Sequence, residues 1–361
     1  PPMRTLISLN GWWGFFFRQN SRILAFTAIL LVVFVTDLGG ASDWPNGQLV
    51  TAKNQHYDDG ITVKMDFASN QVMMISEAEL LMTNKAEVLI NLEDYPIHQA
   101  GAKRDQLIET VRTQLAKDGC AVLKSFLTAE GVRLLRDEAD RVAPFAHASH
   151  GKTNAYFTAD DPSLAVDHPC RRFFDRSNAF VPADHFKTNG ALRRIHDFPA
   201  FDPFIKACLH QHDVYRYADP LADVIVNVAY AGDGFPWHFD TNNFTITLAI
   251  QSADEGGLFE YAPNIRQDGE NFEAVKAVLD GVSDRVKSLA LEPGDLQLFK
   301  GRYSLHRVSP LKGSTPRYVA ILSYVEQPDM VGTPERVKQL YGRVLPIHLE
   351  RAGLRGDSYL D

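Results

Sequence analysis

Cysteine is scarce in this chain. Its 361 residues include three cysteines, namely Cys120, Cys170 and Cys208, which are far apart and form no C-x-x-C pair. An odd number of scattered thiols argues against a disulfide framework and against a cysteine-ligated zinc site. This usage is typical of a reducing compartment and predicts a cytoplasmic protein.

Blocks of basic residues, internal repeats and low-complexity segments are also missing. The formal net charge is -8 and 45% of the residues are hydrophobic. This composition supplies a globular core but neither a nucleic-acid surface nor a polybasic membrane patch. It favours a small-molecule substrate, and it says nothing about oligomeric state.

No hydrophobic run is long enough for a confident membrane span. The longest, residues 23–35, reads ILAFTAILLVVFV and follows Arg18 and Arg22. As a helix it would cover about 20 Å, short of a hydrocarbon core roughly 30 Å thick. A signal or anchor segment is one interpretation, and only that interpretation leaves export or membrane contact open.

A second interpretation is that the N-terminal segment is not part of the native protein. Pro-Pro precedes the first methionine, and Met73, Met74 and Met82 stand just ahead of the first convincing globular pattern. Either way, we predict a hydrophobic N-terminal segment, residues 1–81, followed by one catalytic domain with a helical lead-in, residues 82–361.

That domain begins with helices and continues with strands. Periodicity predicts a helix from Arg104 to Asp118, a short strand after Gly119, and a helix capped by Thr128. Residues 145–205 lack clear periodicity and are expected to form loops and short helices. β-Branched or aromatic runs bounded by turns then predict strands at 223–230, 244–251, 257–262, 286–292, 295–299 and 317–324.

The order of these elements predicts a mostly β fold with flanking helices, in which a cupin-like, double-sheet jelly roll forms the core. In the run 244–251, apolar residues alternate with small or polar ones, so one face can line a cavity. Helices are expected at 271–279 and after Thr333-Pro334. The latter is expected to pack outside the barrel.

His238 and Asp240 stand two positions apart, so a strand would place both side chains on one face. With twelve histidines in the chain, roughly one His-x-Asp pair is expected by chance. His306 strengthens the pattern, because it follows a turn at Pro293-Gly294 and a strand. Two histidines and one carboxylate form a facial triad that holds iron(II) and leaves three coordination positions open.

Arg317 begins the apolar run RYVAILSY. A lone guanidinium buried there would be costly without an anionic partner. Its two parallel donors suit the distal carboxylate of 2-oxoglutarate. A structural ion pair with an Asp or Glu is the alternative.

Together, His238-x-Asp240, the segment HRVSP from His306 and then Arg317 resemble the motif series of iron(II)- and 2-oxoglutarate-dependent oxygenases. Further segments resemble a bacterial subgroup that contains free amino-acid hydroxylases and radical halogenases; they are DHPCRRFF (167–174), YRYADPL (215–221), WHFDTNNFTITLAIQ (237–251) and GGLFEYAPNIR (256–266). The resemblance covers about residues 105–350.

The resemblance implies a double-stranded β-helix core, iron(II) held by the triad, and O2-dependent decarboxylation of 2-oxoglutarate coupled to oxidation of an unactivated C–H bond. Ascorbate is a candidate reductant. In halogenating members a small residue replaces the carboxylate ligand, so that a halide ion can occupy its position. Asp240 therefore favours hydroxylation, of a free amino acid or a related amine.

Four further residues are candidate contacts. Asn227 is a candidate for the co-substrate, and Trp237, Asn242 and Arg172 are candidates for the substrate. Simple packing or surface placement is the alternative for each.

Two other function classes compete with the oxygenase. A zinc-dependent hydrolase also uses two histidines and a carboxylate, but it would not need Arg317. The third class is a non-catalytic protein that binds small molecules on the same barrel.

Overall fold

The computed structural model describes residues 49–52, 61–66, 71–76, 86–211 and 213–351. The chain divides into two compact units, Pro1–Leu81 and Met82–Asp361. In the first unit, a three-stranded antiparallel sheet consists of β1 (Leu49–Ala52), β2 (Ile61–Asp66) and β3 (Gln71–Ser76).

The hydrophobic run 23–35 lies outside the described residues. Within the described ranges, no helix has both the length and the apolar character needed to cross a membrane. The division into an N-terminal segment, residues 1–81, and a domain, residues 82–361, with the two interpretations of that segment, stays a prediction.

The second unit is built around an eight-stranded antiparallel sheet. Along the sheet the order is β4-β13-β10-β15-β8-β6-β5, and the short β7 pairs with β15. These strands are β4 (Cys120–Leu123), β5 (His147–Thr153), β6 (Phe174–Val181), β7 (Tyr215–Arg216), β8 (Val224–Ala229), β10 (Phe244–Gln251), β13 (Leu296–Phe299) and β15 (Arg317–Val325).

A smaller four-stranded sheet has the order β12-β11-β14-β9. Its strands are β9 (Phe235–His238), β11 (Phe259–Ala262), β12 (Lys287–Leu289) and β14 (Leu305–Val308). The two antiparallel sheets, flanked by helices, confirm the predicted mostly β fold with a jelly-roll core of the double-stranded β-helix type.

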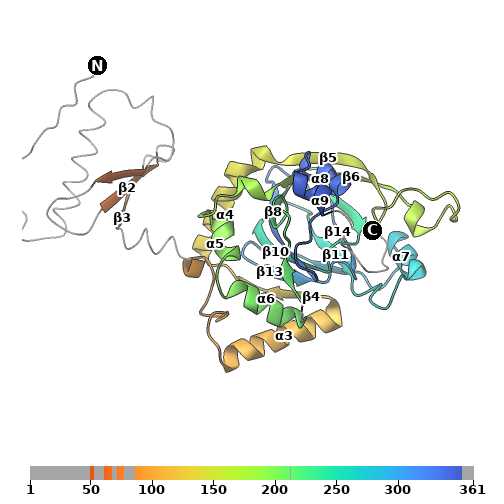
Figure 1. Cartoon of the computed structure of the whole chain (residues 1–361), viewed down its shortest axis with the longest axis horizontal. Helices are drawn as coiled ribbons and strands as arrows, with labels where there is room; N and C mark the ends of the chain where they lie inside the picture. Colours follow the sequence, from red (N-terminus) through yellow and green to blue (C-terminus); the bar gives the residue numbers. More distant parts are fainter. Residues whose placement is uncertain (1–48, 53–60, 67–70, 77–85, 212, 352–361) are drawn as a thin grey trace, which may run out of the picture. The chain divides into compact units, whose positions relative to one another are not determined.

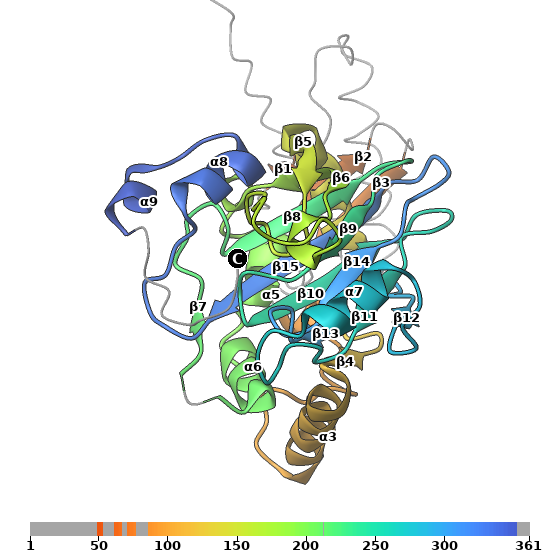
Figure 2. The same cartoon turned by 90° about the vertical axis from the view of Figure 1, so that its right-hand side faces the viewer.

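Helices α3 to α6 gather on one side of the strands, whereas α7 lies on the opposite side (Figure 1). In Figure 2, α8 lies beside β5 with α9 next to α8, and α3 and α6 lie at the lower end of the view. The helices are α3 (Ala102–Asp118), α4 (Ala129–Val142), α5 (Ala191–His196), α6 (Phe201–Leu209), α7 (Phe272–Leu279), α8 (Pro334–Tyr341) and α9 (Pro346–Glu350).

The predicted starts of three helices are confirmed by their caps. The side chain of Thr128 accepts a hydrogen bond from the Gly131 N–H at 2.9 Å, which satisfies a free donor of the first turn of α4. Asn271 caps α7 in the same way, and Thr333 caps α8.

The central strands separate a helix-facing side from a cavity-facing side. On β10, Ile246, Leu248 and Ile250 join the main hydrophobic core, which also contains the buried residues of α3 to α6. Thr245 and Thr247 alternate with them and line a cavity between the sheets. The predicted cavity-lining strand is therefore confirmed.

Two expectations about the fold are wrong. Residues 147–153 and 174–181, expected to lie in loops, form β5 and β6 of the main sheet. Their sequences, HASHGKT and FDRSNAFV, carry weak alternation, and β5 is an edge strand whose exposed face needs no apolar residues. Helix α8 was the second error, because its residues line the cavity and do not pack only on the outside of the barrel.

Candidate metal centre

Antiparallel pairing of β9 with β14 brings the two predicted histidines together. His238 ends β9, and His306 lies directly opposite it on β14. The imidazole centroids are 4.1 Å apart, and both side chains are buried. The two residues are far apart in the sequence, and the register of β9 against β14 brings them together.

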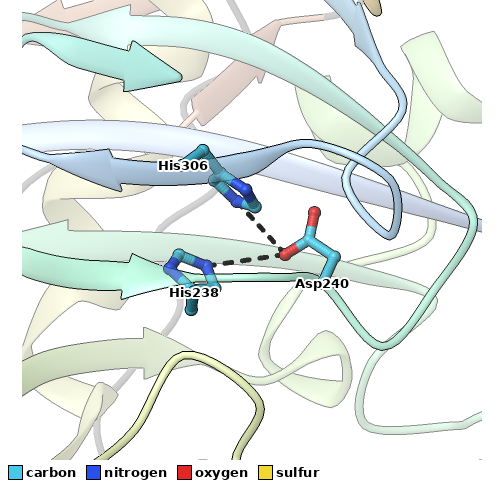
Figure 3. A group of neighbouring side chains, drawn as sticks. All are labelled: His238, Asp240 and His306. Carbon is cyan, nitrogen blue, oxygen red and sulfur yellow. Dashed lines mark ion pairs between the residues drawn. The ribbon is translucent and has the colours of Figure 1, made fainter. Parts of the chain in front are cut away.

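Asp240 completes the group from the loop that follows β9. Its Oδ1 atom lies 3.6 Å from Nε2 of His238 and 3.4 Å from Nε2 of His306. Figure 3 shows both imidazoles directed at this one oxygen. Bonds of about 2.0–2.2 Å to a divalent metal place neighbouring donor atoms about 3.0–3.5 Å apart. The spacing therefore suits one metal ion, and this is the one such group found among the described residues.

Backbone carbonyls orient both imidazoles. Nδ1 of His238 lies 2.8 Å from the Pro236 carbonyl oxygen, and Nδ1 of His306 lies 2.9 Å from that of Ser304. A carbonyl only accepts, so Nδ1 carries the proton in each ring, and Nε2 keeps its lone pair for a metal.

Two residues that were not predicted from the sequence hold Asp240 in place. Thr245 donates its hydroxyl to Oδ2 of Asp240 at 2.6 Å, which leaves Oδ1 free to bind metal. Gly301 accepts a hydrogen bond from the Asp240 N–H at 3.1 Å through its carbonyl. A Cβ atom on Gly301 would lie only 1.9 Å from Oδ2. The sequence signal that could have pointed to Gly301 is its position just after the strand that precedes His306.

The electrostatics keep the donors in metal-binding forms. Burial, followed by the nearby His306, lowers the pKa of His238 to about 4. Burial alone would raise the pKa of Asp240, but the two imidazoles outweigh it and hold this pKa well below its ordinary value. At neutral pH, His238 is therefore neutral and Asp240 is ionised, as metal binding requires.

Gly301→Ala is expected to weaken iron(II) binding by on the order of 10- to 100-fold, as for other groups that only orient a metal ligand. The added methyl group must turn the Asp240 carboxylate away from the imidazoles. Iron(II) titration measures the loss. Gly151→Ala is the control, because a Cβ atom there meets nothing within 4 Å. Equal affinities in the two variants would contradict this reading.

The three donors line a cavity of about 200 Å³ between the sheets, which also contains Arg317. Arg317 is only 8% exposed, and no acidic side chain among the described residues pairs with it. Burial lowers the pKa of Arg317 to about 10, so the guanidinium is charged at neutral pH. The predicted alternative, a structural ion pair, is not observed in the described part of the chain.

The other predicted contacts divide into two groups. Asn227 and Asn242 line the cavity, and Asn227 also donates to the Ala179 carbonyl at 3.1 Å. Trp237 is not among the lining residues. It points to the other side of β9, where it packs in a second hydrophobic cluster. Arg172 pairs with Asp280 beside α7 and is not among the residues that line this cavity, so its role as a substrate contact stays a prediction.

The sequence reading also missed Phe157 and Arg336, both of which line the cavity. The Phe157 ring centroid is 5.6 Å from that of His238, and its backbone has a left-handed φ of 59°. Asn154 holds this conformation by accepting from the N–H groups of Tyr156 and Thr158 at 3.0 and 3.1 Å. Such strain in a bulky residue is found where a site fixes it.

The family model described as Halogenase D matches residues 103–339. The chain belongs to the Halogenase D family. The matched region contains all three donors of the metal centre and Arg317, so the predicted membership of the iron(II)- and 2-oxoglutarate-dependent oxygenase superfamily is confirmed.

Solved structures with a similar course of chain include a 2OG-Fe(II) oxygenase family oxidoreductase from Burkholderia pseudomallei, with 10% identity and a TM-score of 0.42 over 63% of this chain and 93% of that one. A prolyl-4-hydroxylase from Pseudomonas putida has 15% identity and a TM-score of 0.39, covering 61% of this chain and 100% of its own.

The non-heme alpha ketoglutarate dependent epimerase SnoN from nogalamycin biosynthesis has 13% identity and a TM-score of 0.44, covering 62% of this chain and 82% of its own. No curated protein matches the chain.

The residues present in this Halogenase D family member fit its expected cofactors. Three donors on one side of a metal leave positions for a bidentate keto acid and O2. Arg317 is buried and has no acidic partner within the described ranges, so it offers a charge partner for the second carboxylate of that keto acid. Iron(II) as the metal and 2-oxoglutarate as the co-substrate are confirmed on these grounds.

Proposed function

We propose that this protein hydroxylates an unactivated C–H bond of a small molecule, namely a free amino acid or a related amine. The observation that carries the choice of hydroxylation is Asp240. Its Oδ1 lies within 3.6 Å of both imidazole Nε2 atoms, in the ligand position that a halogenating relative leaves open for a halide ion.

Halogenation is the second candidate, because the family model bears that name. The side chain of Asp240 argues against halogenation. Thr245 donates to Oδ2 of the carboxylate and the Gly301 carbonyl accepts from the Asp240 N–H, so the side chain and the backbone of Asp240 are both held in the ligand position. The position is built for a carboxylate ligand.

Iron(II) and 2-oxoglutarate, when bound, supply the oxidising chemistry, and the side chains of the chain hold and orient the reactants. His238, Asp240 and His306 hold the metal. Arg317 binds the distal carboxylate of the co-substrate through two parallel N–H donors. Val319 and Ile321 follow Arg317 on the cavity side of β15 and exclude water from the reaction site.

An activity assay tests the proposal directly. The protein is incubated with iron(II), ascorbate, 2-oxoglutarate and a panel of amino acids and amines, in chloride-containing and chloride-free buffer. Succinate formation with a mass gain of one oxygen in a panel compound supports hydroxylation. A chlorinated product without a hydroxylated one would overturn it in favour of halogenation.

Anaerobic titration separates the oxygenase from the zinc hydrolase and from the non-catalytic binding protein. An iron(II) chelate of 2-oxoglutarate gives a weak visible absorption band. We expect this band for the full chain with iron(II), and we expect zinc to abolish succinate formation. Neither alternative function requires the band or the formation of succinate.

A further inference from the structure

A second guanidinium lines the cavity that contains the one assigned to the co-substrate. Arg336, from the first turn of α8, lines the same cavity as His238 and Asp240. Its guanidinium carbon lies 4.0 Å from the centroid of the Phe157 ring, and this ring is the one that contacts His238. Phe157 thus connects Arg336 to the metal centre.

No acidic side chain in the described part of the chain pairs with Arg336. Its side chain donates one hydrogen bond, from Nη1 to Oε1 of Gln339 at 2.8 Å. The face of the Phe157 ring attracts the cation but does not neutralise it. Burial, and then the charge of Arg176, lower the pKa of Arg336 to about 10, so the side chain is a cation at neutral pH.

Arg176 on β6 adds to the positive potential. It is 2% exposed, and its side chain donates a hydrogen bond from Nη2 to the hydroxyl of Ser149 at 2.7 Å. Its Nε and Nη1 atoms are buried without a partner, and no carboxylate of the described residues faces it. Arg176 and Arg336 repel each other, and the charge of Asp240 offsets this repulsion only in part. An anion bound near the two cations would relieve it.

The structure fixes Arg336 in place. Asp219 accepts hydrogen bonds from the N–H groups of Leu221 at 2.8 Å and of Gly332 at 2.9 Å. The same carboxylate lies 3.1 Å from Nε2 of His348, and both of these side chains are fully buried. The segment that leads into α8 is therefore anchored on both sides of Arg336, and its guanidinium meets a ligand without a large ordering cost.

The cavity offers nothing comparable to a positively charged group. Among the described residues that line it, the acids are Asp219 and Asp240. Asp219 is occupied by backbone N–H groups and by His348. Asp240 is occupied by Thr245 and is directed at the metal centre. A substrate ammonium group would therefore find no free carboxylate there.

We infer that the group recognised in this cavity is the carboxylate of the substrate, bound by the guanidinium of Arg336 at the end of the cavity formed by α8 and Phe157. This inference rests on the proposed function and narrows its substrate class to compounds that carry an acid. Arg317 and Arg336 then divide the labour, since Arg317 binds the co-substrate and Arg336 binds the compound that is oxidised.

The test compares acids with their carboxamides. The iron(II)- and 2-oxoglutarate-loaded enzyme is given free amino acids, their C-terminal carboxamides and matching amines without a carboxylate, and the product mass gain is measured. For the compound turned over, kcat/KM is expected to fall roughly 100-fold on passing from acid to amide, as for loss of one partner of a buried charge pair.

Arg336→Leu is expected to lower kcat/KM for the acid by the same factor and to remove the preference for acid over amide. The KM for 2-oxoglutarate and the visible band of the iron chelate should not change. Arg336→Lys should restore part of the activity. Arg343→Leu is the matched control, because Arg343 pairs with Asp184 at the surface nearby.

A second arm needs no known substrate. Sodium acetate is expected to raise the melting temperature of the loaded wild-type protein above that in sodium chloride of equal ionic strength, and Arg336→Leu should abolish this difference.

Equal turnover of acid and amide, an acetate effect that survives in Arg336→Leu, or an Arg336→Leu defect confined to 2-oxoglutarate would each overturn the inference. Absence of the visible band and of succinate formation would instead overturn the proposed function itself.

Discussion

Arg317→Leu is expected to raise the KM for 2-oxoglutarate by on the order of 100-fold or more, because it removes one partner of a buried charge pair. Arg317 is buried and has no acidic partner among the described residues. The same substitution should leave the melting temperature of the co-substrate-free protein unchanged or raise it, because an unpaired buried cation costs free energy. Succinate release at varied 2-oxoglutarate and thermal melting measure the two effects.

The melting experiment distinguishes the two interpretations of Arg317. If Arg317 formed a structural ion pair, its removal would lower the stability of the protein by several kcal/mol. If Arg317 is a ligand-binding cation, its removal would not lower the stability. Arg317→Lys keeps the charge but loses the paired donors, and it should show an intermediate KM. Arg133→Leu is a suitable control, because Arg133 pairs with Glu130 on the surface of α4. A marked fall in stability with an unchanged KM would show that Arg317 does not bind 2-oxoglutarate.

Asp240→Gly is expected to lower hydroxylation by more than about 100-fold, beyond the loss typical of groups that only orient a ligand. The substitution removes the one anionic donor that faces both Nε2 atoms. Product mass spectrometry in chloride-containing buffer measures the loss of the one-oxygen product and reports any chlorinated one. The comparison shows directly whether Asp240 selects the outcome of the reaction.

Asp268→Gly supplies the control for Asp240→Gly, because Asp268 is exposed in a turn outside the cavity. We expect its activity to equal that of the wild type. Hydroxylation that persists in Asp240→Gly at the wild-type rate would show that Asp240 is not a ligand, and the proposed function would lose the observation on which it rests.

The metal centre could be predicted because its signal is local. His238 and Asp240 lie close in the sequence at strand spacing, and His306 follows a turn and a strand that any sheet would return toward them. Arg317 could be predicted for a different reason. A lone cation at the start of an apolar strand is costly, and that cost is visible without coordinates.

The residues that hold Asp240 could not be predicted in the same way. Thr245 reads as one of several small residues on a cavity-facing strand, and its hydrogen bond to Asp240 depends on the path of the loop between them. Gly301 reads as a turn residue. Gly301 follows β13 and Asp240 follows β9, and these strands belong to different sheets. The close approach of Gly301 to Oδ2 therefore depends on how the two sheets pack, which no local sequence pattern predicts.

Arg172 and Arg336 also show that the sequence alone does not decide which arginine lies in the cavity. Both are arginines outside the strand pattern, and the sequence reading favoured Arg172 because its surroundings resemble the family. The structure pairs Arg172 with Asp280 and places Arg336 in the cavity through α8. Whether a flexible cation finds an acid depends on which elements pack beside it.

The sequence by itself determined the fold class, the positions of the central strands, the three candidate metal donors and the presence of a lone cation, Arg317, on an apolar strand. The strands and the donors follow from alternation and spacing along the chain, and Arg317 follows from the cost of a lone cation on an apolar strand. Only the tertiary structure decided which polar groups hold Asp240 and which second cation lines the cavity. Those contacts join residues such as Phe157 and Arg336, which are distant along the chain and meet only when α8 packs against β5 and β6.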